Sequence, residues 1–247
     1  MSIASNIKPD LSIVLPCYNE ADNIPFIFEQ FISAIGDADF LEIILVNNGS
    51  TDNSEEIFEQ ELLKNNDSRF KVVKVEKNQG YGFGILFGLE KAEGKILAFT
   101  HADLQTPPKD VLTAYHLFKN KMNPMLVVKG RRKNRAIIPA FFTWGMQVIS
   151  SIALKVNLKD IAGQPKVFSR YFYTYYLLNK APHDFSLDLF LMYWVVKEGK
   201  VIETPVYFEK RLHGEAKGGG SLKTRIKVTK RTWDYIFELR KKIKSKK

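Results

Sequence analysis

Short apolar runs that alternate with helical segments constrain the fold of this chain more than any other feature. Residues 11–16, 42–46 and 71–75 read as strands, and each is followed by a segment that reads as a helix. A fourth apolar run, 97–100, ends in polar residues and two prolines. This alternation is typical of a doubly wound α/β fold with a parallel sheet. With 45% hydrophobic residues among 247, the chain can bury the core that such a fold needs.

The pattern is less regular after residue 120. Residues 125–128 predict a strand that ends at Lys129, residues 186–196 a core helix, and residues 201–208 a late strand. Between them, residues 137–156 are apolar but carry too many polar side chains for a confident membrane span. We expect this segment to form an amphipathic helix, packed on the domain or on a membrane surface.

Polar residues after the fourth apolar run form the first candidate site. Asp103 and Gln105 follow a predicted buried strand, so they lie at the carboxyl edge of the sheet, where open α/β sheets bind ligands. In extended backbone the two would face the same side, and their oxygens could hold a hard divalent cation against a phosphate. The alternative is a solvated loop in which Asp103 caps the helix that Pro107 and Pro108 open.

The glycine-rich run at residues 80–84 is a weaker signal. It lacks the Gly-Lys-Ser/Thr of a Walker phosphate loop, and it follows the third strand, unlike a dinucleotide-binding fingerprint. We interpret its glycines as allowing close helix packing and close approach of the backbone to a ligand.

The net charge of +10 is concentrated at one end of the chain. From Ser221 onward, eleven basic and two acidic residues contribute +9, which leaves +1 for the rest. A basic tail is typical of attachment to a membrane surface or a nucleic acid.

The single cysteine, Cys17, excludes an intramolecular disulfide, and we expect it to be a small buried residue. Residues 1–10 show no secretory signal, which points to the cytoplasm.

Six motifs in consistent order, between about residues 11 and 220, carry a resemblance to a known family. The chain resembles the family 2 inverting glycosyltransferases of GT-A fold, and among them the dolichol-phosphate mannosyltransferase-like branch. The motifs are Leu15–Glu20, Val46–Asp52, Asn78–Gly80, Ala102–Gln105, Gly130–Arg132, and Arg211 with Gly214, Glu215 and Lys217. The resemblance implies a Rossmann-like, mixed but mostly parallel sheet. It also implies a catalytic domain over residues 1–220, and the charge pattern predicts a basic amphipathic helical tail over 221–247.

The resemblance also assigns roles to individual residues. Asp103 and Gln105 match the residues that hold Mg²⁺ or Mn²⁺ on the donor diphosphate. The residues that match the nucleotide-binding part are Pro16, Tyr18, Glu20, Asn48, Gly80, His101 and Ala102. The expected catalytic set is Asp103, Arg132, Arg211, Lys217 and Asp188. Asp160 and Gln164 match an acceptor-side loop, although a turn between helices explains them equally well.

Three positions depart from the family pattern. His101 stands where the family usually has Asp, either as a ligand that suits Mn²⁺ or as a ring packed beside the site. Asn47 and Asn48 replace the usual Asp pair, and the carbonyl and NH₂ groups of Asn48 fit a pyrimidine better than guanine. We therefore expect a UDP- or dTDP-sugar, with CDP possible. Ala216 replaces the usual serine and removes one possible phosphate donor.

The sequence does not decide between two classes of sugar acceptor, a lipid phosphate and a sugar hydroxyl. A polyprenyl phosphate is already ionised and needs no strong base, so Asp188 would then orient Arg211 or cap a turn. A sugar hydroxyl of a lipid-linked glycan would need a base, and Asp188 would supply it. A third alternative is a non-catalytic basic module in which His101 marks a lost active site.

The basic tail fits the polyprenyl phosphate acceptor. We expect Trp233, Phe237 and the surrounding basic residues to hold a peripheral enzyme on the anionic inner face of a membrane. No nucleic acid partner is expected, and the sequence indicates no oligomeric state.

Overall fold

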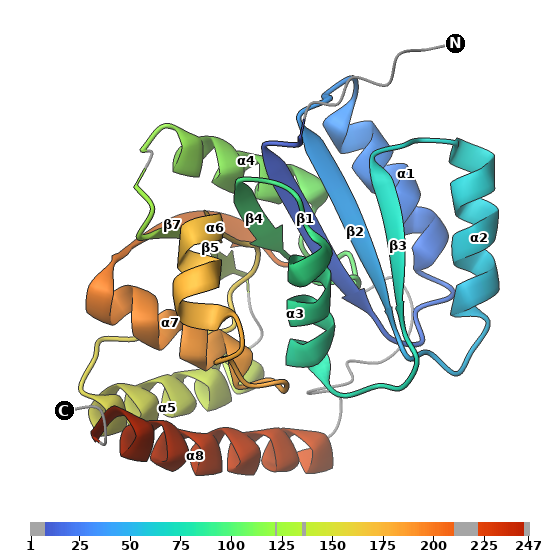
Figure 1. The fold of residues 1–247 in the computed structure, drawn as a ribbon. Helices are drawn as coiled ribbons and strands as arrows, with labels where there is room; N and C mark the ends of the chain where they lie inside the picture. The colour runs from blue at the N-terminus through green and yellow to red at the C-terminus, as the bar shows by residue number, and fades with distance from the viewer. Residues whose placement is uncertain (1–7, 122, 135–136, 210–221, 245–247) are drawn as a thin grey trace.

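The computed structural model describes residues 8–121, 123–134, 137–209 and 222–244. These residues form a seven-stranded sheet of order β3-β2-β1-β4-β6-β5-β7 (Figure 1). Its strands are β1 Leu11–Cys17, β2 Leu41–Asn48, β3 Phe70–Val75, β4 Ile96–Phe99, β5 Leu126–Lys133, β6 Lys166–Ser169 and β7 Lys200–Tyr207. Only β6 is antiparallel to its neighbours β4 and β5. The expected mixed, mostly parallel sheet is confirmed.

Helices cover both faces of the sheet (Figure 1). One face carries α1 Ile24–Ile35, α2 Ser54–Asn65 and α4 Pro108–Lys119, and the other carries α3 Tyr81–Lys91, α6 Arg170–Phe172, the π-helical turn η1 Tyr173–Leu177, and α7 Leu187–Glu198. Strand alternation supplies both cores. Ile13 and Leu15 face the first set of helices and Val14 the second. Burial on both faces explains why the strands read as continuous apolar runs.

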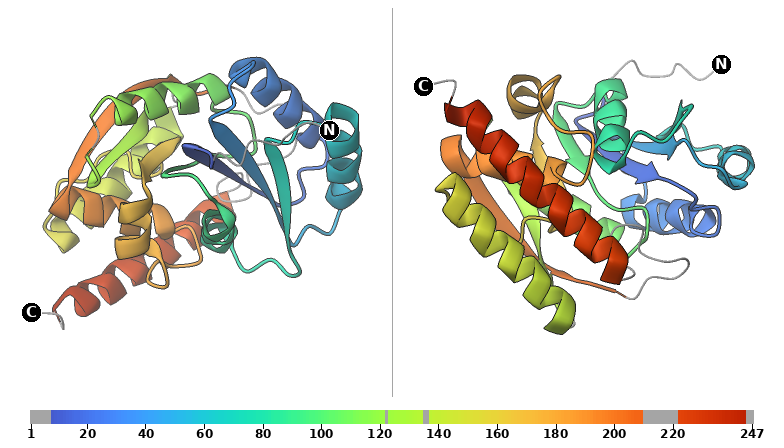
Figure 2. Two further views of the ribbon diagram at one scale, coloured as in Figure 1. Left: turned by 45° about the horizontal axis from the view of Figure 1, so that its top comes forward. Right: turned by 90° about the horizontal axis from the view of Figure 1, so that it is seen from below.

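Helices α5 (Ile137–Leu154) and α8 (Leu222–Lys244) lie against each other. Figure 2 shows them side by side. Tyr235, Ile236 and Leu239 of α8 are buried and belong to the same core cluster as α7. Trp233 and Phe237 are 40% and 45% exposed. The basic segment is therefore helical and anchored to the α/β body by its apolar side. None of the described helices combines the length and apolar character required to cross a membrane.

Two expectations about the later strands were wrong. β5 does not end at Lys129 but continues to Lys133, so Arg131 and Arg132 lie within a strand paired with β7. β6 was missed, because it has four residues and begins with a lysine. Lysine is rarely found inside a sheet unless its charge is paired, and Lys166 is fully buried.

Candidate active site

The loops after β1 and β2 are bonded to each other at the carboxyl edge of the sheet. The Asn19 backbone N–H donates to Ser50 Oγ at 3.0 Å, and the Thr51 N–H donates to Asn19 Oδ1 at 2.8 Å. Asn19 adopts a left-handed backbone, with φ 52°. Glu20 Oε2 accepts a hydrogen bond from Asn23 Nδ2 at 2.5 Å, just before α1 begins. Pro16 lies near the end of β1, paired with Val46, and Tyr18 lies on the following loop, whose shape is fixed by the neighbouring loop.

The segment after β3 closes onto this pair of loops. Gly49, with φ 68°, lies so close to the next segment that a Cβ would approach Asn78 N to 2.2 Å. The Asn48 side-chain Nδ2 donates to the Gly80 carbonyl at 3.1 Å. Asn48 is 2% exposed, and its Oδ1 has no hydrogen-bond partner among the described residues. A buried acceptor without a partner costs free energy.

The glycines of α3 serve close packing, as expected. A Cβ on Gly84 would come within 2.8 Å of Asn48 Nδ2, and one on Gly88 within 2.4 Å of Val14. At Gly80 and Gly82, the neighbours are backbone carbonyls of residues 182–184. Another stretch of the same chain therefore lies against these two glycines, and the expected approach of their backbone to a ligand stays a prediction.

The turn after β4 places Asp103 and Gln105 differently from the extended run that we expected. Leu104 is buried with φ 56°, so the backbone turns there, and the Gln105 N–H donates to Asp103 Oδ1 at 3.1 Å. The helix-capping alternative is also wrong, because Pro107 occupies the N-cap of α4 without a side-chain cap bond. The Gln105 Nε2 donates to the Glu209 carbonyl at 3.0 Å.

The donor set around this turn fits a divalent cation that shares its coordination with phosphates. Asp103 supplies a 93%-buried carboxylate and Gln105 an amide oxygen. Among the described residues, no group of three or more His, Cys, Asp or Glu gathers as a complete protein cage. Mg²⁺ sites that use one or two protein ligands plus substrate phosphates have this composition.

His101 and the buried Ala102 precede Asp103 on the same turn. The His101 ring lies against Tyr81, with centroids 5.8 Å apart. Burial lowers the pKa of His101, while the negative charges of Asp103 and Asp188 oppose this effect. A neutral imidazole is compatible with either role that the sequence left open, packing or metal ligation.

Arg132 and Asp160 come together as an ion pair. The Arg132 backbone N–H donates to Asp160 Oδ2 at 2.9 Å, and its guanidinium donates to Oδ1 through Nε and a terminal nitrogen. Burial alone would raise the pKa of Asp160, but the bonds and charge of Arg132 lower it overall. The guanidinium also lies over the Phe208 ring, 6.0 Å from its centroid. The turn that contains Asp160 is therefore held against β5 through Arg132.

Asp188 and Gln164 also meet. Asp188 lies in the first turn of α7, 5% exposed, and its Oδ1 accepts from Lys166 Nζ at 2.5 Å and from Gln164 Nε2 at 3.1 Å. Gln164 Nε2 also contacts the Tyr81 hydroxyl at 3.3 Å. Sequence reasoning missed Lys166. A lysine in the short apolar run before Ser169 was the signal available, because such a charge needs a buried partner.

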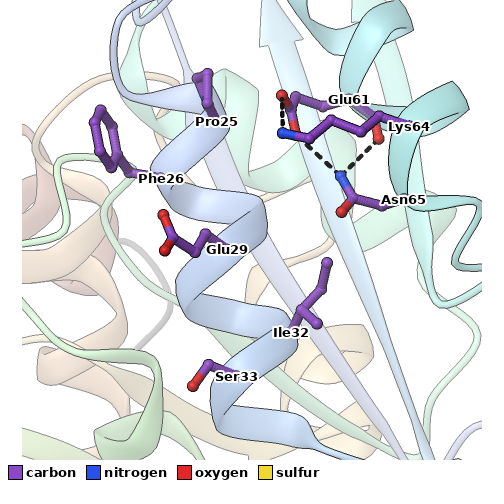
Figure 3. A pocket seen from close by; sticks show the side chains of 8 residues that line it. All are labelled: Pro25, Phe26, Glu29, Ile32, Ser33, Glu61, Lys64 and Asn65. Atoms are coloured by element: carbon purple, nitrogen blue, oxygen red, sulfur yellow. Dashed lines mark hydrogen bonds and ion pairs between the residues drawn. The ribbon is translucent and has the colours of Figure 1, made fainter.

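The remaining predicted site residues, Arg211 and Lys217, lie outside the described residues. A separate surface hollow lies between α1 and α2, lined by Pro25, Phe26, Glu29, Ile32, Ser33, Glu61, Lys64 and Asn65 (Figure 3). It contains none of the predicted site residues. The chemistry-bearing side chains instead gather at the carboxyl ends of β1, β2 and β4.

The family model described as glycosyl transferase family 2 matches residues 12–173. The chain belongs to glycosyl transferase family 2. This family 2 chain is 32% identical over 127 residues to the undecaprenyl-phosphate 4-deoxy-4-formamido-L-arabinose transferase of Pseudomonas syringae pv. syringae, covering 51% of the chain and 37% of the relative. The enzyme of that name from Yersinia pestis is 30% identical over 135 residues, covering 54% and 41%. The aligned regions thus span about two fifths of these curated relatives.

Solved structures share the fold of this family 2 chain. Glucosyl-3-phosphoglycerate synthase from Mycobacterium tuberculosis, with Mn²⁺, UDP and glucosyl-3-phosphoglycerate, has a TM-score of 0.68 and 16% identity, covering 94% of this chain and 80% of that one. A mannosyltransferase from Pyrobaculum calidifontis, with GDP-Man and Mn²⁺, has a TM-score of 0.60 and 20% identity, covering 87% and 59%. At these identities the likeness shows the GT-A fold alone.

Proposed function

We propose that this protein is a metal-dependent inverting glycosyltransferase that moves a sugar from a nucleoside diphosphate donor to a polyprenyl phosphate. The carrying observation is that Asn48, with its buried acceptor, and the Asp103–Gln105 turn lie at the same edge of the sheet. The names of the relatives support the lipid phosphate acceptor. The neighbours solved with Mn²⁺ and a nucleotide support a divalent cation, Mg²⁺ or Mn²⁺.

The hydrogen bonds of Asn48 favour a pyrimidine base. Its Nδ2 already donates to Gly80, which leaves Oδ1 as a single acceptor. Uracil and thymine each present one N–H on the edge that such an acceptor would read, whereas guanine presents an N–H and an NH₂ that favour a carboxylate. UDP and dTDP sugars are therefore the proposed donors.

The chemistry requires stabilisation of the departing diphosphate. When bound, the cation neutralises negative charge that develops on the leaving oxygens. Asp103 and Gln105 would hold that cation, while Arg211 and Lys217 are proposed to contact the phosphates. Removing one preorganised contact of this kind typically costs ~3 kcal/mol, or roughly a hundredfold in rate.

We further propose that α8 attaches the enzyme to the inner face of a membrane. Its buried residues anchor it to the body, while Trp233 and Phe237 remain partly exposed among basic residues. Lys230, Arg231, Lys241 and Lys242 are exposed on the same helix. Aromatic and basic side chains together favour an anionic lipid surface, where a polyprenyl phosphate is found.

The test is thermal unfolding of the full chain with UDP, dTDP, GDP and CDP, each with and without Mn²⁺. A nucleotide at a hundred times its Kd should add ~2.7 kcal/mol of stability. We expect UDP or dTDP to raise the melting temperature only with the metal, and Asp103→Ala to abolish the rise. No shift with any nucleotide would contradict the proposal and favour the non-catalytic basic module.

A further inference from the structure

A buried lysine lies beside the candidate active site, in a strand that the sequence did not reveal. Lys166 is the first residue of β6 and is fully buried. Its Nζ donates to Asp188 Oδ1 at 2.5 Å and to the Gly163 carbonyl at 3.1 Å, and it lies 5.5 Å from the centroid of the Phe99 ring. Burying an ammonium group is costly unless it is paired and hydrogen-bonded. The next two residues of β6, Val167 and Phe168, are buried and apolar, so Lys166 is the charged position of this strand.

The Lys166–Asp188 pair is connected to the candidate donor site through two side chains. Gln164 Nε2 contacts Asp188 Oδ1 at 3.1 Å and the Tyr81 hydroxyl at 3.3 Å. Tyr81 begins α3, directly after Gly80, the residue that accepts from Asn48. Its ring lies against His101, two residues before Asp103. Tyr81 therefore lies between the proposed base-binding end and the proposed metal-binding end of the site.

We propose that Lys166 is a positioning residue: its ammonium group fixes Asp188 and Gln164, which together hold Tyr81 against His101. Asp188 then accepts hydrogen bonds from this network and is not the base of the reaction. This inference rests on the proposed function and deepens it, because an acceptor that is already ionised, as a phosphate is, needs no base at Asp188.

The surroundings of the pair agree with this role. Asp188 Oδ1 accepts both side-chain bonds, and both residues are at least 95% buried. Burial lowers the pKa of Lys166, and the Asp188 carboxylate opposes that effect. His101 lies within electrostatic reach of both charges. Removing either partner would therefore leave an uncompensated charge next to the site.

A double-mutant cycle on the full chain tests the proposal. Lys166→Met, Asp188→Asn and the double variant are compared with the wild type for the urea midpoint of unfolding and for sugar transfer to polyprenyl phosphate. We expect Lys166→Met to lower kcat by about tenfold or more through misplacement of the site, with the donor KM changed by less than about threefold. The double variant should unfold at a higher urea concentration than Lys166→Met and recover part of its kcat, because both charges are then gone.

Two further variants guard against a purely structural explanation. Gln164→Met removes the link to Tyr81 without leaving a buried charge, and we expect it to lower kcat. The matched control is Glu42→Gln, which breaks a buried carboxylate–lysine pair with Lys71 at the opposite, amino-terminal edge of the sheet. It should lower the urea midpoint and leave kcat unchanged.

Three results would overturn the role of Lys166. The first is an additive cycle in both urea midpoint and kcat, and the second is full activity of Gln164→Met. The third is a kcat more than about a thousandfold below the wild type in both Asp188→Asn and the double variant. Loss of a general base has that effect, so Asp188 would then be the base. Absence of transfer by the wild type, with the midpoints still coupled, would instead overturn the proposed function.

Discussion

Asn48 and Gly84 lie in direct contact although 36 positions separate them: a Cβ on Gly84 would approach the Asn48 Nδ2 atom to 2.8 Å. The absence of a side chain at Gly84 lets α3 lie against the end of β2. It also leaves the Asn48 amide in the orientation in which Nδ2 donates to Gly80. The helix surface thus sets the direction of the buried Oδ1 acceptor.

Gly84→Ala should therefore weaken nucleotide binding. The added methyl group displaces the Asn48 amide, and we expect the Kd of the preferred nucleoside diphosphate to rise about tenfold, the loss of one well-formed hydrogen bond. Calorimetric titration with Mn²⁺ present measures this. The control is Gly145→Ala in α5, where a Cβ meets nothing within 4 Å; it should leave the Kd unchanged. Equal affinity of Gly84→Ala and wild type would contradict the assignment of Asn48 to the base.

The strand–helix order and the carboxyl-edge location of Asp103 and Gln105 could be predicted because both depend on local sequence, whereas the turn at Leu104 was not expected. Residues 97–105 carry the strand, the turn and both proposed ligands within one short stretch. The resemblance added roles that local pattern does not contain. Arg132 and Asp160 were both predicted as site residues, but their ion pair was not predicted. The two residues are 28 positions apart, and no repeating sequence pattern reveals a contact over that separation.

The network around Lys166 could not be predicted for a related reason. β6 is too short to show the alternation of apolar and polar residues that is typical of a strand. Its first residue, Lys166, is charged but buried in the sheet, so the sequence did not indicate a strand there. The partner of Lys166, Asp188, is on helix α7, 22 positions away. Such contacts form only when the tertiary structure brings the two segments together, so the sequence offered Asp188 as a base or a cap and gave no reason to join it to Lys166.

Membrane attachment should depend on the exposed aromatic pair of α8. The Trp233 and Phe237 rings lie 5.6 Å apart and are partly exposed. We expect Trp233→Ala/Phe237→Ala to reduce co-sedimentation with vesicles that contain anionic phospholipid. Added salt should weaken the residual binding, because each Lys or Arg near the surface contributes ~1 kcal/mol.

Leu63→Ala in α2 is the control, since Leu63 is 83% exposed but far from the basic segment in sequence and on a different helix. It should sediment as the wild type does. Undiminished binding by the Trp233/Phe237 variant would show that α8 is not the attachment surface.

Cys17 should be inert in the folded protein. It is fully buried, its Sγ donates to the Leu15 carbonyl at 3.5 Å, and burial together with the nearby Glu20 charge raises the pKa of its thiol. Since the thiolate is the reactive form, a disulfide reagent at pH 8 should label the native chain far more slowly than the urea-unfolded chain. As the chain has one cysteine, the signal reports a single site. Rapid labelling of the native chain would mean that the β1 loop opens readily.

Stability should decline in acid partly through Glu42. Its side chain is 4% exposed and lies 2.8 Å from Lys71 Nζ, and it also accepts from Ser12 and from the Glu93 N–H. Burial alone would raise the pKa of Glu42, but these partners lower it below its ordinary value of 4.5. A carboxyl whose pKa is lower in the folded state stabilises the protein above pH 4.5, and that contribution disappears as the pH falls through the folded-state value.

Glu42→Gln should therefore be less stable than the wild type at pH 7, by about 2 kcal/mol, the cost of disrupting a buried, charge-assisted hydrogen bond. The difference should shrink below pH 4.5, because the wild type then loses the same charge. Urea unfolding at several pH values measures both quantities. Glu55→Gln, which breaks an exposed pair with Lys74, should change stability little at any pH. A Glu42→Gln deficit that stays constant down to the acid transition would show that Glu42 contributes through packing and not through its charge.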